Sequence, residues 1–276
     1  MAKTYVEVLS GASSFLEAAG KEGYAIEYLF LARKGWDKTH WLLKMREEIP
    51  SADQAIIEKD LAALMKNIPP QYLLGYESFF DHRFKVTEAT LIPRPETEEL
   101  VALCLELNDY KPKKVIDIGT GTGAIAVSLK LARPAWQVTA VDISDAALNV
   151  AQENAKMLGA EIVFKESDVL AAITEKQDII ISNPPYISED EWDLMDESVR
   201  TYEPKTALFA ENHGLAIYQK IAEQSQRLLE STGMILLEIG FQQGVAVQEI
   251  FQTAFPEKRV TVQQDMAKND RMVVVR

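Results

Sequence analysis

The fold of this chain is decided by the stretch Asp178-Ile179-Ile180-Ile181-Ser182-Asn183-Pro184-Pro185-Tyr186. Its isoleucine run is continuously apolar and β-branched, which predicts a buried strand of a parallel sheet. Pro184 and Pro185 end the strand because proline has no N–H for the ladder and holds the preceding residue extended. Asn183–Tyr186 is therefore predicted to be a stiff turn at the carboxyl end of a strand, where open α/β sheets bind their ligands.

Strand-like and helix-like segments alternate from residue 114 to the end of the chain. The predicted strands are 115–118, 138–141, 162–164, 179–181, 234–239, 260–263 and 272–275. The predicted helices are 124–131, 146–158, 215–229 and 245–251. This rhythm predicts an α/β fold with a doubly wound, mainly parallel sheet.

The preceding third of the chain has a different pattern. Residues 1–68 carry apolar side chains at helical spacing, which predicts a bundle of four or five short helices. Aromatic residues alternate with polar ones after Pro69-Pro70, which predicts a hairpin. We therefore divide the chain into a helical domain (1–70), a hairpin linker (71–92) and a main domain (93–276). The helical domain either stabilises the main domain or recognises the substrate, and we expect the second role.

A glycine-rich loop, Gly119-Thr120-Gly121-Thr122-Gly123, follows the first predicted strand of the main domain and opens a helix. Glycines let the backbone turn tightly and approach a ligand closely. The spacing is not the Gly-x-Gly-x-x-Gly of dinucleotide-binding proteins, and no Lys-Ser/Thr pair follows as in a P-loop. The loop therefore predicts a nucleoside-bearing cofactor of another kind.

Acidic residues at the strand ends indicate which cofactor. Asp142 is placed to accept hydrogen bonds from ribose hydroxyls, about 20 residues beyond the loop. Asp117 would repel a pyrophosphate but suits a sulfonium or an ammonium group, and S-adenosylmethionine carries both. Asp168 is placed to accept from the adenine amino group, and Val169 to pack on the adenine face. The predicted cofactor-binding residues are Gly119, Thr120, Gly121, Thr122, Gly123, Asp142, Asp168, Val169 and Asn183.

The chemistry predicted for Asn183–Tyr186 is methyl transfer to a planar amino group. Such a nitrogen is a poor nucleophile and bears two N–H donors. The Asn183 side-chain oxygen and the Pro184 carbonyl would each accept one of them, which aligns the nitrogen and favours the positive charge that builds on it. Tyr186 would stack on the flat group. The predicted catalytic residues are Asn183, Pro184 and Tyr186; the predicted substrate-binding residues are these three with Pro185, Arg94 and Glu96.

Charge and composition exclude several classes of protein. Residues 1–85 hold 11 Lys and Arg against 12 Asp and Glu, whereas residues 86–276 hold 18 against 30, so the main domain carries most of the net charge of −13. This argues against stable nucleic-acid binding. A single cysteine, Cys104, and three scattered histidines predict no disulfide and no metal site. The chain has no apolar run long enough for a bilayer and no apolar signal core, so we expect a cytoplasmic protein without membrane contact.

These motifs resemble the class I methyltransferases that modify planar amino groups. A wider set resembles the bacterial release factor glutamine methyltransferases: Gln71–Gly75, Ile92–Glu98, Gly119–Gly123, Asn183–Ile187, Glu203-Pro204 and Leu237–Gly240. The resemblance covers essentially the whole chain. It implies a Rossmann-like class I fold, S-adenosyl-L-methionine as methyl donor with S-adenosyl-L-homocysteine as product, and methylation of the glutamine amide in the Gly-Gly-Gln motif of peptide chain release factors.

Three positions depart from that family's pattern. Val169 stands where an aromatic residue is frequent. No glycine occurs in Ala267–Arg271, before the final strand, and Glu211-Asn212-His213 replaces a turn rich in glycine and aspartate.

Other functions share parts of this site. A ribosomal-protein glutamine methyltransferase would use the same chemistry. A methyltransferase of adenine or cytosine amino groups would stack a flipped base on Tyr186, but the acidic main domain disfavours it. An inactive scaffold that binds the cofactor and holds a partner through the helical domain would not need Asn183 and Tyr186.

Overall fold

The computed structural model describes residues 3–276, without the side chain of Leu194. The chain forms two compact units. The first comprises the residues up to Tyr76 together with Asp196–Tyr202, and the second comprises Glu77–Met195 and Glu203–Arg276. None of the described helices is both long and apolar enough to cross a bilayer.

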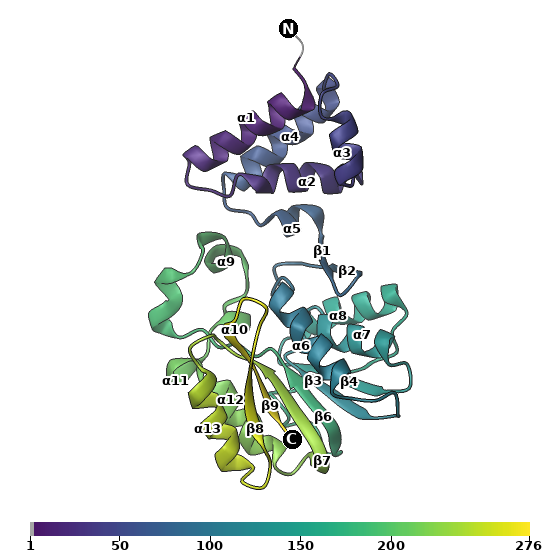
Figure 1. Ribbon diagram of the computed structural model, residues 1–276, viewed down its shortest axis with the longest axis vertical. Coiled ribbons are helices and arrows are strands. Elements are labelled where there is room, and N and C mark those ends of the chain that lie inside the picture. Colours follow the sequence, from purple (N-terminus) through teal and green to yellow (C-terminus); the bar gives the residue numbers. More distant parts are fainter. Residues whose placement is uncertain (1–2) are drawn as a thin grey trace. The chain divides into compact units, whose positions relative to one another are not determined.

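The first unit contains a bundle of short helices, as predicted (Figure 1): α1 (Tyr5–Ala18), α2 (Tyr24–Lys34), α3 (Lys38–Lys44), α4 (Ser51–Leu64) and α5 (Pro70–Leu74). The short helix α9 (Glu197–Tyr202) also belongs to this unit and was not predicted. Its core contains two buried carboxylates, and each is paired. Asp53 accepts from the Tyr5 hydroxyl at 2.6 Å and lies 3.0 Å from the Lys34 ammonium, while Asp60 lies 2.8 Å from the Arg33 guanidinium. Such pairing is what allows a carboxylate to be buried.

The predicted hairpin is present as β1 (Tyr76–Phe79) and β2 (His82–Lys85). Its turn residues, Phe80 and Asp81, have φ of 49° and 64°, the left-handed geometry of a two-residue hairpin turn. The residues just before the hairpin form the short helix α5, because Pro70 favours a helix start and Gly75 ends it with φ of 79°.

A seven-stranded sheet forms the centre of the second unit (Figure 1), which confirms the predicted fold class. Its strands are β3 (Lys114–Ile118), β4 (Gln137–Asp142), β5 (Val163–Glu166), β6 (Gln177–Ser182), β7 (Leu229–Glu238), β8 (Val260–Gln264) and β9 (Asp270–Val275). Their order is β5-β4-β3-β6-β7-β9-β8. The first five are parallel to one another, and β9 runs antiparallel to both β7 and β8.

Helices cover both faces of this sheet. The face of Val115 is covered by α6 (Pro95–Glu106), α7 (Ala124–Ala132) and α8 (Asp145–Leu158). The face of Ile116 is covered by α12 (Ala216–Ser225) and α13 (Gly244–Ala254). Four short helical segments lie between β6 and α12 in the chain: α9, and with it η1 (Glu189–Leu194), α10 (Lys205–Leu208) and α11 (Glu211–Gly214). Neighbouring residues of β3 face opposite cores because side chains alternate along a strand.

One predicted helix was too long. We expected a helix over 215–229, but α12 ends at Ser225 and Leu229 begins β7. The Leu228 carbonyl accepts from the Gln177 N–H at 2.7 Å, and Leu229 lies opposite Gln177 in the ladder. Pairing with the neighbouring strand therefore overrides the helical pattern there.

Candidate active site

Two loops meet at the carboxyl ends of β3 and β6, the neighbouring strands in the middle of the sheet. The strand order reverses between β3 and β6, which pair from Val115↔Ile179 to Ile118↔Ser182. The glycine loop leaves β3 and Asn183–Tyr186 leaves β6 at the same edge, at the kind of switch point where open α/β sheets bind ligands. The Ser182 hydroxyl donates to the Ile118 carbonyl at 2.7 Å and joins the two strand ends.

The glycine loop is left-handed at all three glycines. The φ angles of Gly119, Gly121 and Gly123 are 68°, 53° and 81°. A Cβ on Gly119 or Gly121 would meet none of the described atoms within 4 Å, whereas a Cβ on Gly123 would lie 3.2 Å from the Ala151 Cβ. Gly123 therefore serves close packing on α8, and the other two glycines leave open space beside the loop.

Asp142, at the end of β4, holds this loop in place. Its Oδ2 accepts from the Gly121 N–H at 2.9 Å, and its Oδ1 accepts from the Ser144 N–H at 3.0 Å. Burial raises the pKa of Asp142, and these N–H donors oppose the rise. Each carboxylate oxygen has a second lone pair, so Asp142 can also accept from ligand hydroxyls.

Asp117 lies directly beneath the loop and is fully buried. Its Oδ2 accepts from the Thr120 hydroxyl at 2.6 Å, while Oδ1 has no hydrogen-bond partner among the described residues. Burial raises the pKa of Asp117 to about 7, and the neighbouring Asp142 adds to the rise. A buried, incompletely satisfied carboxylate of this kind would be stabilised by a nearby cation.

A cavity of about 160 Å³ opens where the two loops meet. Its walls include Gly119 and Gly121 of the glycine loop, Asp142, Ser144, Val169 and Asn183–Pro185, but not Thr120, Thr122 or Gly123. Most of the residues predicted for the cofactor thus line one cavity, as do Asn183 and both prolines of the predicted turn.

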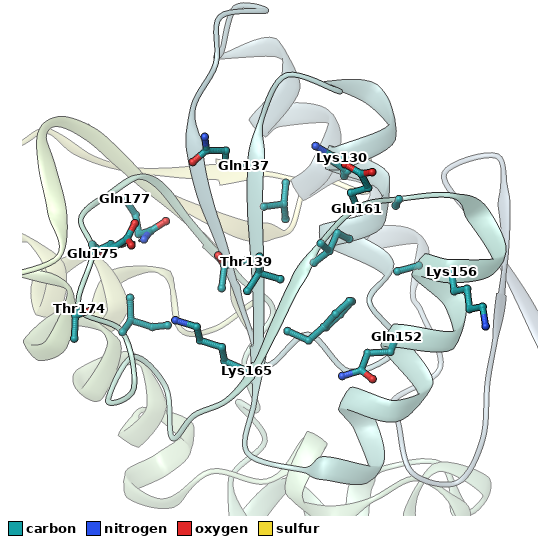
Figure 2. A pocket seen from close by; sticks show the side chains of 17 residues that line it. Lys130, Gln137, Thr139, Gln152, Lys156, Glu161, Lys165, Thr174, Glu175 and Gln177 are labelled. Atoms are coloured by element: carbon teal, nitrogen blue, oxygen red, sulfur yellow. Dashed lines mark hydrogen bonds between the residues drawn. The ribbon is translucent and has the colours of Figure 1, made fainter.

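A larger hollow, of about 720 Å³, lies along the edge strand β5 and reaches the amino ends of β4 and β6 (Figure 2). Gln137 and Gln177, which begin β4 and β6, mark its position, and Lys130 and Lys165 also line it. The Lys130 ammonium already donates to the carbonyls of Pro134 and Trp136, both at 2.9 Å. None of the predicted site residues lines this hollow, so its size does not make it the active site.

The Asn183 side chain is held by two residues that lie in the family motifs Ile92–Glu98 and Leu237–Gly240 but were not predicted as site residues. Its Nδ2 donates to the Thr97 hydroxyl at 3.0 Å, and that hydroxyl donates to Glu238 Oε2 at 2.6 Å. Thr97 lies in the first turn of α6, and Glu238 is the last residue of β7. Both are buried, whereas Asn183 is half-buried and lines the cavity.

Tyr186 is held through its backbone. Its carbonyl accepts from Gln243 Nε2 at 3.0 Å, and a Cβ on Gly214 would lie only 2.1 Å from the same oxygen. Burial raises the pKa of Tyr186 to about 12, and the charge of Glu238 adds to the rise. The ring therefore stays neutral, as a stacking surface should.

Comparison with known proteins identifies the family. Residues 7–75 match the PrmC N-terminal domain and residues 97–268 match the methyltransferase small domain. The release factor glutamine methyltransferase of Enterococcus faecalis is 59% identical over 275 residues, covering 99% of both chains. That of Lactococcus lactis is 49% identical over 261 residues, covering 95% of this chain and 97% of the relative. The chain belongs to the release factor glutamine methyltransferase family.

Solved structures extend the likeness to the fold. A methyltransferase from Pyrococcus furiosus superposes with a TM-score of 0.56 at 14% identity, covering 79% of this chain and 98% of its own. The human Mettl16 catalytic domain superposes with a TM-score of 0.51 at 17% identity, covering 71% of this chain and 76% of its own. This release factor glutamine methyltransferase family member thus shares the methyltransferase fold.

S-adenosylmethionine is the cofactor of this methyltransferase. The cavity fits it on three observations. Gly119 and Gly121 leave open space beside the loop, Asp142 offers acceptors to ribose hydroxyls, and the buried Asp117 retains an unpaired Oδ1 near the loop. The acidic character suits a ligand that carries a sulfonium and an ammonium group.

Arg94 and Glu96, predicted to contact the substrate, lie at the start of α6. The Arg94 guanidinium forms an ion pair with Glu203, whose buried carboxylate also accepts from the Ile92 N–H at 3.0 Å. Pro204, next in the chain, lines the cavity. Arg94 thus anchors a segment of the cavity wall, while Glu96 is half-buried and close enough to Tyr186 to affect its pKa.

The structure also places the residues predicted for adenine. Asp168 and Val169 both line the cavity, but Asp168 forms an ion pair with Lys220. Val169 is buried and has a φ of 56°, which is strained for a β-branched residue. The non-glycine turns that depart from the family pattern are left-handed too, at Asn212, with φ of 54°, and at Lys268, with φ of 65°.

Proposed function

We propose that this methyltransferase transfers a methyl group from S-adenosyl-L-methionine to the side-chain amide nitrogen of the glutamine in the Gly-Gly-Gln motif of peptide chain release factors. The observation that carries the proposal is the orientation of Asn183. Its N–H donates to Thr97, so Oδ1 is the end of the amide that remains for a ligand. An acceptor in that position matches the N–H donors of a glutamine amide.

The residues of the chain position the substrate rather than activate it by a strong base. Asn183 Oδ1 and the Pro184 carbonyl would each accept one N–H of the glutamine amide and fix the nitrogen for in-line attack. Both acceptors also favour the positive charge that develops on that nitrogen during transfer. When bound, S-adenosylmethionine supplies an electrophilic methyl group on sulfur. The glutamine nitrogen gains the methyl and loses one proton to water, and S-adenosylhomocysteine is the other product.

Tyr186 and the start of α6 would complete the substrate site. The neutral Tyr186 ring offers a flat wall for the planar amide, and Gln243 and Gly214 hold its backbone in place. Glu96 lies close to Tyr186 and would meet the backbone around the glutamine. Arg94 would act through its ion pair with Glu203, which holds the wall beside Pro204.

The partners follow from the same proposal. The named relatives are release factor glutamine methyltransferases, which supports a release factor as the protein substrate. The helical domain, residues 1–70, would recognise that protein outside the glutamine loop. Translation factors act in the cytoplasm, where we place this enzyme, and the acidic main domain argues against stable nucleic-acid binding.

Transfer of tritium from labelled S-adenosylmethionine tests the substrate. We expect label on a release factor, and none on its Gln→Ala variant at the Gly-Gly-Gln motif or on DNA. Label on the Gln→Ala variant or on DNA would contradict the proposal. Preferential labelling of a ribosomal protein would keep the amide chemistry and change the substrate.

Asn183→Ala tests the mechanism. We expect cofactor binding to persist in part while turnover falls far more than tenfold. A tenfold loss corresponds to about 1.4 kcal/mol of activation barrier. The matched control is Asn108→Ala, because the buried Asn108 amide donates to the Cys104 carbonyl at 2.8 Å, away from the cavity. A loss of turnover within tenfold in Asn183→Ala would refute the two-acceptor mechanism.

A further inference from the structure

The Asn183 amide has two ends that differ in chemistry, and only one of them suits the proposed substrate. The side-chain oxygen accepts a hydrogen bond, whereas the NH₂ group donates. A glutamine amide presents N–H donors to the site. A 180° flip of the Asn183 amide would place donor against donor, so some feature of the protein must fix its orientation.

We propose that Glu238, acting through Thr97, sets the orientation of the Asn183 amide and that both are positioning residues for methyl transfer. The proposal rests on the proposed function and on an unbroken chain of two hydrogen bonds. Asn183 Nδ2 lies 3.0 Å from Thr97 Oγ1, which lies 2.6 Å from Glu238 Oε2. Three separate elements supply these groups: the turn after β6, the start of α6 and the end of β7.

The direction of the chain follows from the number of protons in it. A carboxylate only accepts, and the Thr97 hydroxyl has a single proton to give. If Glu238 is ionised, that proton points at Glu238, and Thr97 can only accept from Asn183. Asn183 must then donate its N–H to Thr97, which leaves Oδ1 for the substrate.

Protonation of Glu238 removes this constraint. The neutral carboxyl can donate to Thr97 Oγ1, and the Thr97 hydroxyl is then free to donate to Asn183 Oδ1. That arrangement flips the amide and turns its NH₂ group to the substrate side. The charge on Glu238 thus selects which end of Asn183 meets the substrate.

Several charged groups act on Glu238. Burial raises the pKa of Glu238 to about 7; the Thr97 hydrogen bond and the charges of Arg271, on β9, and Arg94 lower it, while Glu96 raises it. Thr97 also places the first turn of α6 beside the carboxylate, and the positive end of a helix favours the ionised form. Two phenols, Tyr186 and Tyr218, stay neutral because burial raises the pKa of each.

The first test is the pH profile of turnover on the release factor, at saturating S-adenosylmethionine. We expect wild-type kcat to rise with pH through a midpoint near 7, where Glu238 ionises. Glu238→Gln should lose this limb of the profile because glutamine does not titrate. A profile for Glu238→Gln that keeps the wild-type limb would overturn the proposal.

The second test separates positioning from folding. Glu238→Met removes the acceptor and should lower kcat at pH 8 at least tenfold, without lowering Tm, because a buried charge is replaced by an apolar side chain of similar size. Thr97→Val should also lower kcat at least tenfold, with KM changed less than threefold. Thr97→Ser, which restores the hydroxyl, should recover kcat to within about threefold of wild type.

A control variant removes a buried hydroxyl elsewhere. Ser225 is buried in α12, and its hydroxyl donates to the Ala222 carbonyl at 3.2 Å. Ser225→Ala should keep the wild-type kcat and pH profile. Values of kcat within threefold of wild type for Glu238→Met or Thr97→Val would overturn the proposal, as would losses fully explained by unfolded protein.

A spectroscopic test needs no substrate, so it separates failure of this inference from failure of the proposed function. The Asn183 side-chain NH₂ signals can be assigned in ¹H–¹⁵N spectra by their loss in Asn183→Asp. Their shifts should titrate near pH 7 in the wild-type protein and stay constant in Glu238→Gln. Shifts that do not titrate in the wild type, or that titrate equally in both, would refute the relay even if the enzyme methylates release factors.

Discussion

Gly121→Ala isolates the role of the glycine loop in cofactor binding. Gly121 has a φ of 53°, and a Cβ there would meet none of the described atoms within 4 Å. The fold therefore loses only the backbone preference, about 1 kcal/mol, which corresponds to a fall in Tm of roughly 2–4 °C for a unit of this size. The new methyl group would occupy open space beside the cavity that Gly121 lines.

Affinity for S-adenosylmethionine should fall much more than stability. A methyl group that keeps the cofactor from the loop should raise Kd at least tenfold, or about 1.4 kcal/mol. Gly159→Ala is the matched control, because Gly159 ends α8 with φ of 73°, also has open space at its Cβ and does not line the cavity. It should lower Tm by a similar amount and leave Kd unchanged.

Gly123→Ala should affect the stability of the fold more than Gly121→Ala does. Its Cβ would lie 3.2 Å from the Ala151 Cβ and 3.3 Å from the Ala151 Cα, so α8 must shift. Tm should fall further than in Gly121→Ala. Calorimetric titration with S-adenosylmethionine measures Kd, and thermal melts measure Tm, for the three variants. If Gly121→Ala and Gly159→Ala change Kd equally, the glycine loop is not the cofactor cradle.

Three further predictions concern strain, packing and charge. Lys268→Gly should stabilise the protein by about 0.5–1 kcal/mol, because Lys268 has a φ of 65° in an exposed turn. Urea unfolding measures this change, and an unchanged midpoint would show that the turn is not strained. Gly214→Ala should lower turnover at least tenfold with little change in cofactor Kd, since its Cβ would lie 2.1 Å from the Tyr186 carbonyl oxygen; wild-type kcat would contradict this packing. The positive charges of the cofactor should lower the raised pKa of Asp117, so cofactor binding should release protons and the Kd of the cofactor should increase as pH falls below about 7. Asp117→Asn should lose both effects, which titrations in two buffers would measure.

The same raised pKa values contribute to the pH dependence of folding. Asp117 and Glu238 both have a pKa of about 7 in the folded chain, above their usual range. Between roughly pH 4 and pH 7 the unfolded chain ionises these carboxyls while the folded chain keeps them protonated. Their contribution to the free energy of unfolding therefore falls as pH rises through that window and is constant above it.

The sequence was sufficient for the parts of the fold that local rules determine. An apolar β-branched run ending in two prolines predicts a buried strand and its end, and Gly119–Gly123 predicts a tight strand-to-helix turn. The structure brings both to one switch point beside Asp142. Pairing with a distant strand is not a local property, which is why the sequence pattern predicts a helix up to Leu229, where β7 begins.

Side-chain partners also depend on residues that are distant in the sequence. Arg94 is predicted to meet the substrate, and the structure adds an ion pair with Glu203, a residue 109 positions away. No spacing rule predicts such a pair. Asp168 was likewise predicted to face a ligand, and Lys220 on another element forms an ion pair with it.

The sequence contains a partial signal for the role of Glu238, but none that identifies Thr97 as its partner. Glu238 ends a strand whose preceding residues are apolar and buried, and Asp117 is the next-to-last residue of β3, after two buried apolar residues. An acid at such a position costs free energy unless it is paired, so its presence marks a candidate for a functional or a structural pair. The sequence does not say which group it serves, because Thr97 lies 141 positions from Glu238 and 86 from Asn183. Only the sheet order, which sets β6 beside β7, brings the carboxyl to the amide that it orients.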